Sequence, residues 1–260
     1  MAKHILITGS DGYIGTNLSK YLINYGYFIY YVDKKSGNDA MYYSDYQTCD
    51  AVVHLSAIPG IQKCEDNPMD AIRENVEVAN RVFSWGKKVV FSSSQAAKTP
   101  SNVYACTKFL GEKMANFYNE RGGDIVVLRL SNVFGGDKYL DLKNSVVALF
   151  VKAWQEDRKV SINGDGSQSR DFVHVEDVCE AIRLALEYNG KQIVAPFDIG
   201  TGLATTIKEV AEKLEGLEYE LGGKGLVGVH SSIADLTKIT EFLKFKPKKR
   251  LEDYIRFLRK

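Results

Sequence analysis

Residues 4 to 15 read His4-Ile-Leu-Ile-Thr-Gly9-Ser-Asp-Gly12-Tyr-Ile-Gly15, and this stretch decides the fold. An apolar, β-rich run leads into three glycines and then into an amphipathic segment from Thr16 to Tyr25. A strand, a tight glycine turn and a helix form a mononucleotide-binding unit, in which the helix N-terminus and its dipole meet a pyrophosphate. We therefore predict a dinucleotide site here, although any glycine-rich turn between a strand and a helix gives the same pattern.

Each glycine of this turn has a physical role. Gly9 allows the turn, Gly12 lets the backbone approach the phosphates, and Gly15 lets the helix and the strand pack closely. The predicted cofactor contacts also include the residues between these glycines, namely Asp11, Tyr13 and Ile14.

A carboxylate closes the next predicted strand, Phe28 to Val32, at Asp33. A carboxylate at this position accepts both ribose hydroxyls of an adenosine and repels a 2′-phosphate. The sequence therefore favours NAD over NADP. Lys34 and Lys35 follow immediately, and their charges would weaken that repulsion.

Length and composition indicate one α/β enzyme. The chain has 260 residues, 45% of them hydrophobic and 26% charged, which is enough to bury a large core. A formal net charge of +1 argues against partners held by electrostatics, so we expect neither nucleic acid nor a membrane surface. Four cysteines without C-x-x-C or Cys/His spacing predict reduced thiols and no metal site. We find no signal peptide and no apolar run of membrane-spanning length, so we expect a cytoplasmic protein.

Short apolar runs alternate with helical patterns along the chain. Strands are predicted at residues 51–55, 88–92 and 124–130, with helices around residues 67–85 and 103–120. This order is typical of a Rossmann-type, doubly wound parallel sheet, which binds ligands at the carboxyl ends of its strands. Further helices are predicted near residues 145–156, 175–188 and 205–214. We predict a NAD-binding domain at residues 1–135, to which later segments can return, and a smaller, mainly substrate-binding C-terminal lobe at residues 136–260.

A second pattern lies at Tyr104-Ala-Cys-Thr-Lys108, which begins 10 residues after Ser94. Positions i and i+4 share one face of a helix, so the Tyr104 phenol and the Lys108 ammonium can enter one pocket. A neighbouring cation favours the phenolate and lowers the pKa of the tyrosine, so that it can transfer protons near neutral pH while Ser94 holds the reacting oxygen. Taken alone, the spacing also fits an ordinary surface pair on a helix, and its weight comes from the dinucleotide motif around it.

Further motifs accompany these two in a fixed order. They are Thr8-Gly-Ser-Asp-Gly-Tyr-Ile-Gly15, Val53-His-Leu-Ser-Ala57, Glu74-Asn-Val76, Phe91-Ser-Ser-Ser94, Tyr104-Ala-Cys-Thr-Lys108, Leu128-Arg-Leu-Ser-Asn-Val-Phe-Gly135, Asn163-Gly-Asp-Gly-Ser-Gln-Ser-Arg-Asp-Phe-Val-His-Val-Glu-Asp177 and Phe197-Asp-Ile-Gly-Thr-Gly202. With them, nearly the whole chain resembles the extended short-chain dehydrogenase/reductase superfamily. It is most similar to the NAD-dependent sugar-nucleotide epimerases and dehydratases, of the UDP-galactose 4-epimerase type.

The resemblance implies a role for each cofactor-binding residue. The phosphate loop and Asp33 would hold the adenosine diphosphate half of NAD, while Leu55, Ser56 and Ala57 would line the cofactor. Asn75 would lie close behind it, although an asparagine on a helix face is the alternative.

The resemblance also implies the catalytic and substrate-binding residues. Ser94 would hydrogen-bond the sugar oxygen, Tyr104 would exchange its proton, and Lys108 would bind the nicotinamide ribose. Asn132 and Arg170 would contact the nucleotide diphosphate of the substrate. A guanidinium fork matches phosphate oxygens, but an ion pair with Asp171 or Asp165 is the alternative for Arg170.

The implied reaction is NAD-dependent epimerisation of a nucleotide-diphosphate sugar, most simply at carbon 4, through a transient keto sugar and NADH. Dehydration is disfavoured because Ser94 is followed by Gln95-Ala-Ala97, which cannot move protons, where 4,6-dehydratases carry an Asp-Glu pair. The alternatives are a net dehydrogenase or reductase of a sugar nucleotide or sugar acid, and a non-catalytic NAD-binding regulator. Relatives dimerise through the helices that correspond to residues 67–85 and 103–120, so a homodimer is expected.

The chain departs from the family pattern in three places. The linker from Ser94 to Tyr104 is much shorter than usual, which leaves one wall of the sugar pocket rebuilt or open. The segment from Asp33 to Ala51 is also shortened and is expected to lack a helix. Near the C-terminus, Lys224 stands where the family places a phosphate-binding arginine, and simple solvent exposure is its alternative.

Overall fold

A computed structural model describes residues 3–137, 139, 142, 145–189, 195–223 and 231–258. Its centre is a six-stranded parallel sheet with the strand order β10-β5-β4-β3-β1-β2. The strands are β1 (His4–Thr8), β2 (Phe28–Val32), β3 (Ala51–His54), β4 (Lys88–Ser94), β5 (Asp124–Leu130) and β10 (Phe197–Ile199). Because β1, β3 and β5 are apolar and buried, the sheet forms the core and presents the carboxyl ends of its strands at one edge.

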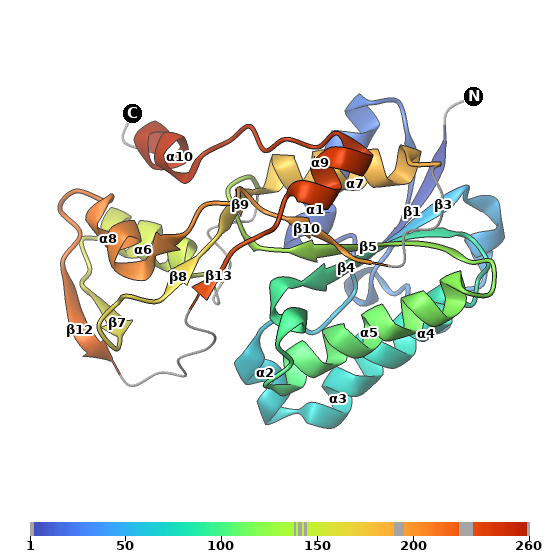
Figure 1. Ribbon diagram of the computed structural model, residues 1–260, viewed down its shortest axis with the longest axis horizontal. Coiled ribbons are helices and arrows are strands. Elements are labelled where there is room, and N and C mark those ends of the chain that lie inside the picture. The colour runs from blue at the N-terminus through green and yellow to red at the C-terminus, as the bar shows by residue number, and fades with distance from the viewer. Residues whose placement is uncertain are drawn as a thin grey trace.

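Helices cover both faces of this sheet (Figure 1). One face is packed by α1 (Tyr13–Asn24), α7 (Val175–Glu187) and α9 (Thr237–Leu243). The other is packed by α4 (Val78–Phe83) and α5 (Val103–Asn119), with α2 (Ile61–Asp66) and α3 (Pro68–Ile72) beside α5. This confirms the predicted α/β, Rossmann-type doubly wound sheet.

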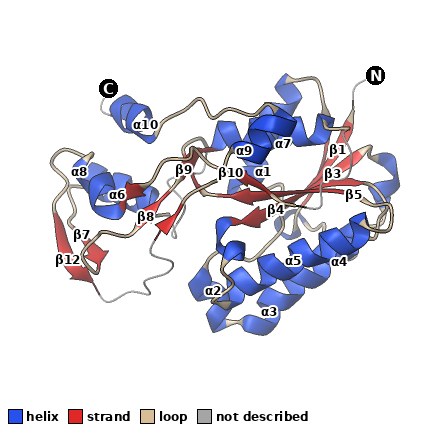
Figure 2. Ribbon diagram, viewed as in Figure 1, coloured by secondary structure: helices blue, strands red, loops and turns tan. Residues whose placement is uncertain are grey.

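The smaller lobe lies beyond the carboxyl edge of the sheet, on the left of Figure 2. Its helices α6 (Val146–Gln155), α8 (Ile207–Glu212) and α10 (Leu251–Leu258) bury a separate apolar cluster. Its short strands are β6 (Asn132–Phe134), β7 (Val160–Asn163), β8 (Ser169–Arg170), β9 (Phe172–His174), β11 (Thr205–Thr206), β12 (Tyr219–Gly223) and β13 (Ser231–Ser232). A capping box between Thr206 and Glu209 starts α8.

Strand β10 and helices α7 and α9 follow residue 135 but pack with the large sheet. They join it because each carries an apolar stripe that the smaller lobe does not bury. The division at residue 135 therefore remains a prediction of where the cofactor and substrate regions meet along the chain.

The long helix predicted around residues 67–85 is a series of three pieces. A π-helical turn, Arg73–Glu77, separates α3 from α4. Such a turn is often found at functional sites, and its buried residues are Asn75 and Val76. The prediction missed α2 and α10, which are short and have only six and eight residues.

The shortened segment after Asp33 contains two 3-10 turns, Lys34–Ser36 and Asp45–Thr48, and no α-helix. The sheet consequently ends at β2, and no described strand pairs with the outer side of β2. Strand β2 reads Phe-Ile-Tyr-Tyr-Val and has no charged residue, and the side chains of Phe28 and Tyr31 are exposed.

Candidate active site

The glycine-rich turn forms a tight cradle at the carboxyl end of β1. Gly9 has a φ of 72°, and a Cβ atom there would lie 2.8 Å from the backbone nitrogen of Ser56. A Cβ on Gly15 would collide with the carbonyl oxygen of Gly9. Gly12 is the N-cap of α1 and offers no side chain to the first N–H groups of the helix. Those groups suit an anion, so the cradle fits the diphosphate of NAD.

The Asp33 carboxylate lies beside this cradle. Its Oδ2 accepts the backbone N–H of Asp11 at 3.1 Å, and its Oδ1 accepts the N–H of Lys35 at 2.9 Å. Lys34 was expected to weaken the repulsion of a 2′-phosphate, but its ammonium is bound by Glu74 at 2.6 Å. Lys34 is thus paired with Glu74 and not with Asp33, which agrees with NAD rather than NADP.

Leu55, Ser56 and Ala57 leave the end of β3 alongside the cradle. The N–H of Leu55 donates to the carbonyl of Thr8 at 3.1 Å, and the N–H of Ser56 reaches Thr8 Oγ1 at 3.4 Å. This segment therefore continues the sheet edge next to the glycine turn, where the sequence placed the lining of the cofactor.

Asn75 holds the continuation of that segment from behind. It is 1% exposed, its Oδ1 accepts the N–H of Ile58 at 2.7 Å, and its Nδ2 donates to the carbonyl of Ile58 at 3.2 Å. Nδ2 also donates to Thr107 Oγ1 on α5 at 3.0 Å. These contacts fit a supporting residue and disagree with an asparagine on an open helix face.

Tyr104 and Lys108 lie one turn apart at the start of α5. Asn102 caps this helix, since its Oδ1 accepts an N–H of the first turn at 2.9 Å. Glu65 on α2 accepts a second N–H of that turn at 2.8 Å. The helix start is thereby fixed from two sides, which fixes the direction of both side chains.

Lys108 is buried, with 4% of its surface exposed. Its ammonium donates to the carbonyl of Ser92 at 2.9 Å and lies 5.4 Å from the centre of the Phe91 ring. Burial lowers the pKa of Lys108 from 10.5 to about 8. The ammonium is thus held against the end of β4, where it keeps two further donors for a ligand.

Burial raises the pKa of Tyr104, and a side-chain hydrogen bond with Ser94 opposes this increase. The expectation that Lys108 lowers the pKa of this tyrosine is therefore wrong for the protein alone. The physical reason is that the phenolate would lose its water, while the Lys108 ammonium is directed at Ser92.

Ser94 ends β4 and meets the Tyr104 side chain there. Its hydroxyl oxygen accepts the N–H of Ala96 at 3.2 Å, which starts the 3-10 turn Gln95–Lys98. The structure therefore brings together the three residues predicted to be catalytic, Ser94, Tyr104 and Lys108. The short linker between them is folded back, because Lys98 forms an ion pair with Asp198 on β10.

Arg170 lies on β8, in the small sheet β11-β8-β13 of the smaller lobe. It is half-buried, its guanidinium donates to the carbonyl of Ser169 at 2.7 Å, and burial lowers its pKa. Among the described residues it forms no ion pair with Asp171, whose carboxylate accepts backbone N–H groups of Thr201, Gly202 and Ala234. The salt-bridge alternative for Arg170 is thus not supported.

Asn132 begins β6, and its side chain is exposed. Its backbone N–H donates to the carbonyl of Asp171 at 3.0 Å, so it lies next to the residue that follows Arg170 in the chain. No hydrogen bond within the described residues links Asn132 or Arg170 to Ser94, Tyr104 or Lys108. Lys224, the third candidate for phosphate, lies outside the described residues.

Sequence reasoning missed one charged residue of this site, Glu112 on α5. It is 3% exposed and is bound by Arg129 and Ser93. The available signal was its spacing, because positions 104, 108 and 112 follow one another at four-residue intervals on one helix face.

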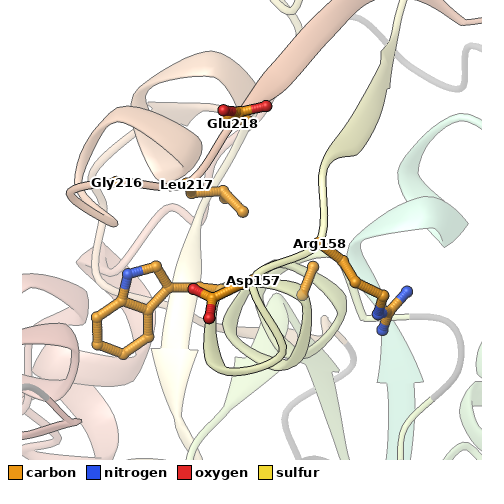
Figure 3. A pocket seen from close by; sticks show the side chains of 7 residues that line it. Asp157, Arg158, Gly216, Leu217 and Glu218 are labelled. Atoms are coloured by element: carbon orange, nitrogen blue, oxygen red, sulfur yellow. The ribbon is translucent and has the colours of Figure 1, made fainter.

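A hollow of about 140 Å³ in the smaller lobe is a different feature (Figure 3). It lies between the end of α6 and the connection from α8 to β12, and Trp154, Arg158 and Leu217 are among its lining residues. None of the predicted site residues lines it.

The described residues contain no group of three His, Cys, Asp or Glu side chains placed to hold a metal ion. All four cysteines are free; three are buried and Cys106 is exposed. Nowhere in the described part of the chain is a helix both long and apolar enough to span a bilayer.

Comparison with known proteins gives one matching family. Residues 5–200 match the model of the NAD dependent epimerase/dehydratase family. A putative UDP-glucose 4-epimerase from Methanocaldococcus jannaschii is 26% identical over 85% of this chain and 83% of the relative. The dTDP-4-dehydro-6-deoxyglucose reductase of Escherichia coli is 28% identical over 66% of this chain and 55% of the relative.

Solved structures give the same fold. The UDP-glucose 4-epimerase of Thermotoga maritima with UDP-glucose is 27% identical, with a TM-score of 0.84 over 98% of this chain and 97% of that one. MoeE5 in complex with UDP-glucuronic acid and NAD is 26% identical, with a TM-score of 0.87 over 97% of this chain and 96% of that one.

Proposed function

Since the chain belongs to the NAD-dependent epimerase/dehydratase family, we propose that it epimerises a nucleotide-diphosphate sugar, at carbon 4, through a transient keto sugar. Its cofactor is NAD, and the protein is an NAD-dependent enzyme that modifies nucleotide sugars. The observation that carries the proposal is the meeting of Ser94, Tyr104 and Lys108 at the end of β4, on the same edge of the sheet as the glycine cradle. The UDP-glucose 4-epimerase of Thermotoga maritima, with its bound UDP-glucose, supports the choice of reaction and substrate class.

The roles of the three residues follow from their contacts. Tyr104 takes the proton of the sugar hydroxyl and later returns it to the keto oxygen. Ser94, which hydrogen-bonds Tyr104, holds that sugar oxygen in line with the phenol. Lys108 uses the donors that Ser92 leaves unoccupied to bind the nicotinamide ribose.

The phenol of Tyr104 needs help to ionise, because burial raises its pKa. NAD, when bound, supplies the hydride acceptor and a positive charge on the nicotinamide ring. A cation beside the tyrosine favours the phenolate, as the Lys108 ammonium was expected to do by itself. With NAD bound, this charge would favour removal of the substrate proton by Tyr104.

The substrate diphosphate is assigned to Arg170 and Asn132. Arg170 is half-buried, carries no carboxylate partner among the described residues, and offers a planar set of N–H donors that matches phosphate oxygens. Asn132 adds an exposed amide on β6, which pairs with β9, the strand that follows Arg170 in the chain. MoeE5 with UDP-glucuronic acid and the Thermotoga enzyme with UDP-glucose support a uridine nucleotide as the first substrate to test.

A net reductase or dehydrogenase is the second candidate, and the similarity to a dTDP-4-dehydro-6-deoxyglucose reductase favours it. The two reactions differ in their use of NAD, since an epimerase regenerates NAD in each cycle. A non-catalytic regulator is the weakest alternative, because binding alone does not need the proton-transfer set Ser94, Tyr104 and Lys108.

We also propose a homodimer. Exposed apolar side chains lie on α5 and beside it on α3, namely those of Met69, Ile72, Leu110 and Phe117. Sedimentation analysis tests this proposal, and a monomer at micromolar concentration contradicts it. The expected cytoplasmic location stays a prediction.

The decisive experiment incubates the purified protein with UDP-, GDP- and dTDP-sugars, with and without added NAD, and identifies the products by chromatography and mass spectrometry. We expect a 4-epimer to form from catalytic amounts of NAD without a net change in nicotinamide absorbance. Product formation in proportion to NAD or NADH consumed would assign the protein to the dehydrogenases or reductases.

A further inference from the structure

Helix α5 carries Tyr104, Lys108 and Glu112 on successive turns; Lys108 and Glu112 are buried, and Tyr104 is partly buried. Two of them tie the helix to consecutive residues of β4. The Lys108 ammonium donates to the carbonyl of Ser92 at 2.9 Å, and Ser93 Oγ donates to Glu112 Oε1 at 2.6 Å. Ser94 is the next residue of β4 after Ser93. These two bonds therefore fix the position of α5 along the strand that carries Ser94.

Glu112 has a second partner on the next strand, β5. Arg129 donates from Nε to Glu112 Oε1 at 2.8 Å and from its terminal nitrogen to Oε2 at 2.6 Å. Both carboxylate oxygens are therefore engaged in a two-pronged pair, and the side chain of Glu112 is only 4% exposed. A carboxylate so deeply buried is stable only while its charge is matched.

We propose that Glu112 is a positioning residue, which keeps the Lys108 ammonium charged in its buried site and fixes α5 so that Tyr104 meets Ser94. Arg129 and Ser93 hold the carboxylate in place for both tasks. The inference rests on the proposed function for the meaning of Tyr104 and Lys108, but its test does not depend on turnover.

The electrostatic argument compares the groups around Lys108. Burial is the largest influence and opposes its charge. The Cys64 side chain on α2 and, after it, Glu112 on the same helix favour the charged form. His54 on β3 also faces Lys108, and its burial and the lysine charge together lower the pKa of the imidazole to about 3, so His54 stays neutral. Tyr104 is uncharged near neutral pH. Glu112 is thus the one full negative charge among these described neighbours.

The test measures the charge of Lys108 directly. Protein labelled with 13C-lysine is titrated by NMR, and the Lys108 signal is identified by its loss in Lys108→Met. The wild-type midpoint is expected at about pH 8. In Glu112→Gln, which keeps the shape of the side chain and removes its charge, the midpoint should fall by about one pH unit. Glu112→Asp, which keeps the charge, should restore most of the difference.

A matched control is Glu180→Gln on α7. Glu180 is bound by Arg183 through the same two-pronged geometry, at 2.7 and 2.9 Å, but it does not face Lys108. The Lys108 midpoint should be unchanged in this variant. If Glu112→Gln does not fold, the double variant Glu112→Met with Arg129→Met replaces the pair by apolar side chains and is titrated instead.

The affinity for NAD gives a second readout that a merely structural role would not produce. At pH 6 Lys108 is charged in both proteins, so Glu112→Gln should bind NAD as wild type does. At pH 8 its affinity should be about fivefold lower, because fewer molecules carry the ammonium. A Lys108 midpoint that is the same in wild type and in Glu112→Gln overturns the inference, whatever reaction the enzyme performs.

Discussion

Lys108→Met should make the protein more stable and less able to bind its cofactor. Burial lowers the pKa of Lys108 from 10.5 to about 8, so its charge costs about 3 kcal/mol more in the folded than in the unfolded chain. Methionine has a similar length and no charge. Its loss of the bond to the Ser92 carbonyl costs about 1 kcal/mol, which leaves a net gain of about 2 kcal/mol at pH 7.

The pH dependence of this gain identifies its cause. Lys108 binds its proton less tightly in the folded protein, so the cost of its charge is full below pH 8. The cost disappears as the pH rises from about 8 towards 10.5, because the folded wild type gives up the proton first. The difference between variant and wild type should therefore shrink over this range.

Urea unfolding from pH 6 to pH 10, followed by circular dichroism, measures both quantities. Lys63→Met, which changes an exposed lysine on α2, is the control and should alter stability little at any pH. Lys108→Met that is less stable than wild type at pH 7, or a difference that stays constant up to pH 10, would refute the reasoning.

Three further predictions concern the proposed reaction. Tyr104→Phe should lower turnover by about 10²–10⁴ and leave NAD binding intact; a variant that turns over as fast as wild type contradicts the assignment of Tyr104. Asp33→Ser should raise the affinity for NADP relative to NAD by about tenfold or more, because a charge repulsion of at least about 1.4 kcal/mol is lost; calorimetry with both cofactors measures this, and an unchanged ratio argues against the placement of Asp33. Arg170→Ala should weaken UDP-glucose binding by about 10–100-fold without changing NAD affinity, because charge-assisted hydrogen bonds are lost; equal loss for both ligands would point to a folding defect instead.

The large sheet was predictable because its signals are local. Strands β2 and β5 begin and end at the predicted residues, since an apolar run bounded by turns specifies both ends. The glycine turn was equally predictable, because the motif alone indicates where a side chain would collide with the backbone.

The properties that depend on burial were not predictable. The pKa of Tyr104 was expected to be lowered and is raised, because the sequence shows the neighbouring lysine but not the loss of water. The partners of Glu112 lie on strands β4 and β5. The sequence alone does not show such contacts between segments that are far apart in the chain. The helix around residues 67–85 was found, but its π turn at Asn75 was not, since the spacing of apolar residues continues through it.

The unpaired outer side of β2 has a consequence for how this protein behaves in bulk. Backbone donors and acceptors on that side pair with no described strand, and the uncharged Phe-Ile-Tyr-Tyr-Val strand lacks the lysines or prolines that usually discourage further strands from adding. The connection from β2 to β3 contains only 3-10 turns and provides no α-helix to cover this side. At high protein concentration and during refolding, we expect strands of other molecules to add to the outer side of β2. This intermolecular β-sheet formation would compete with native folding.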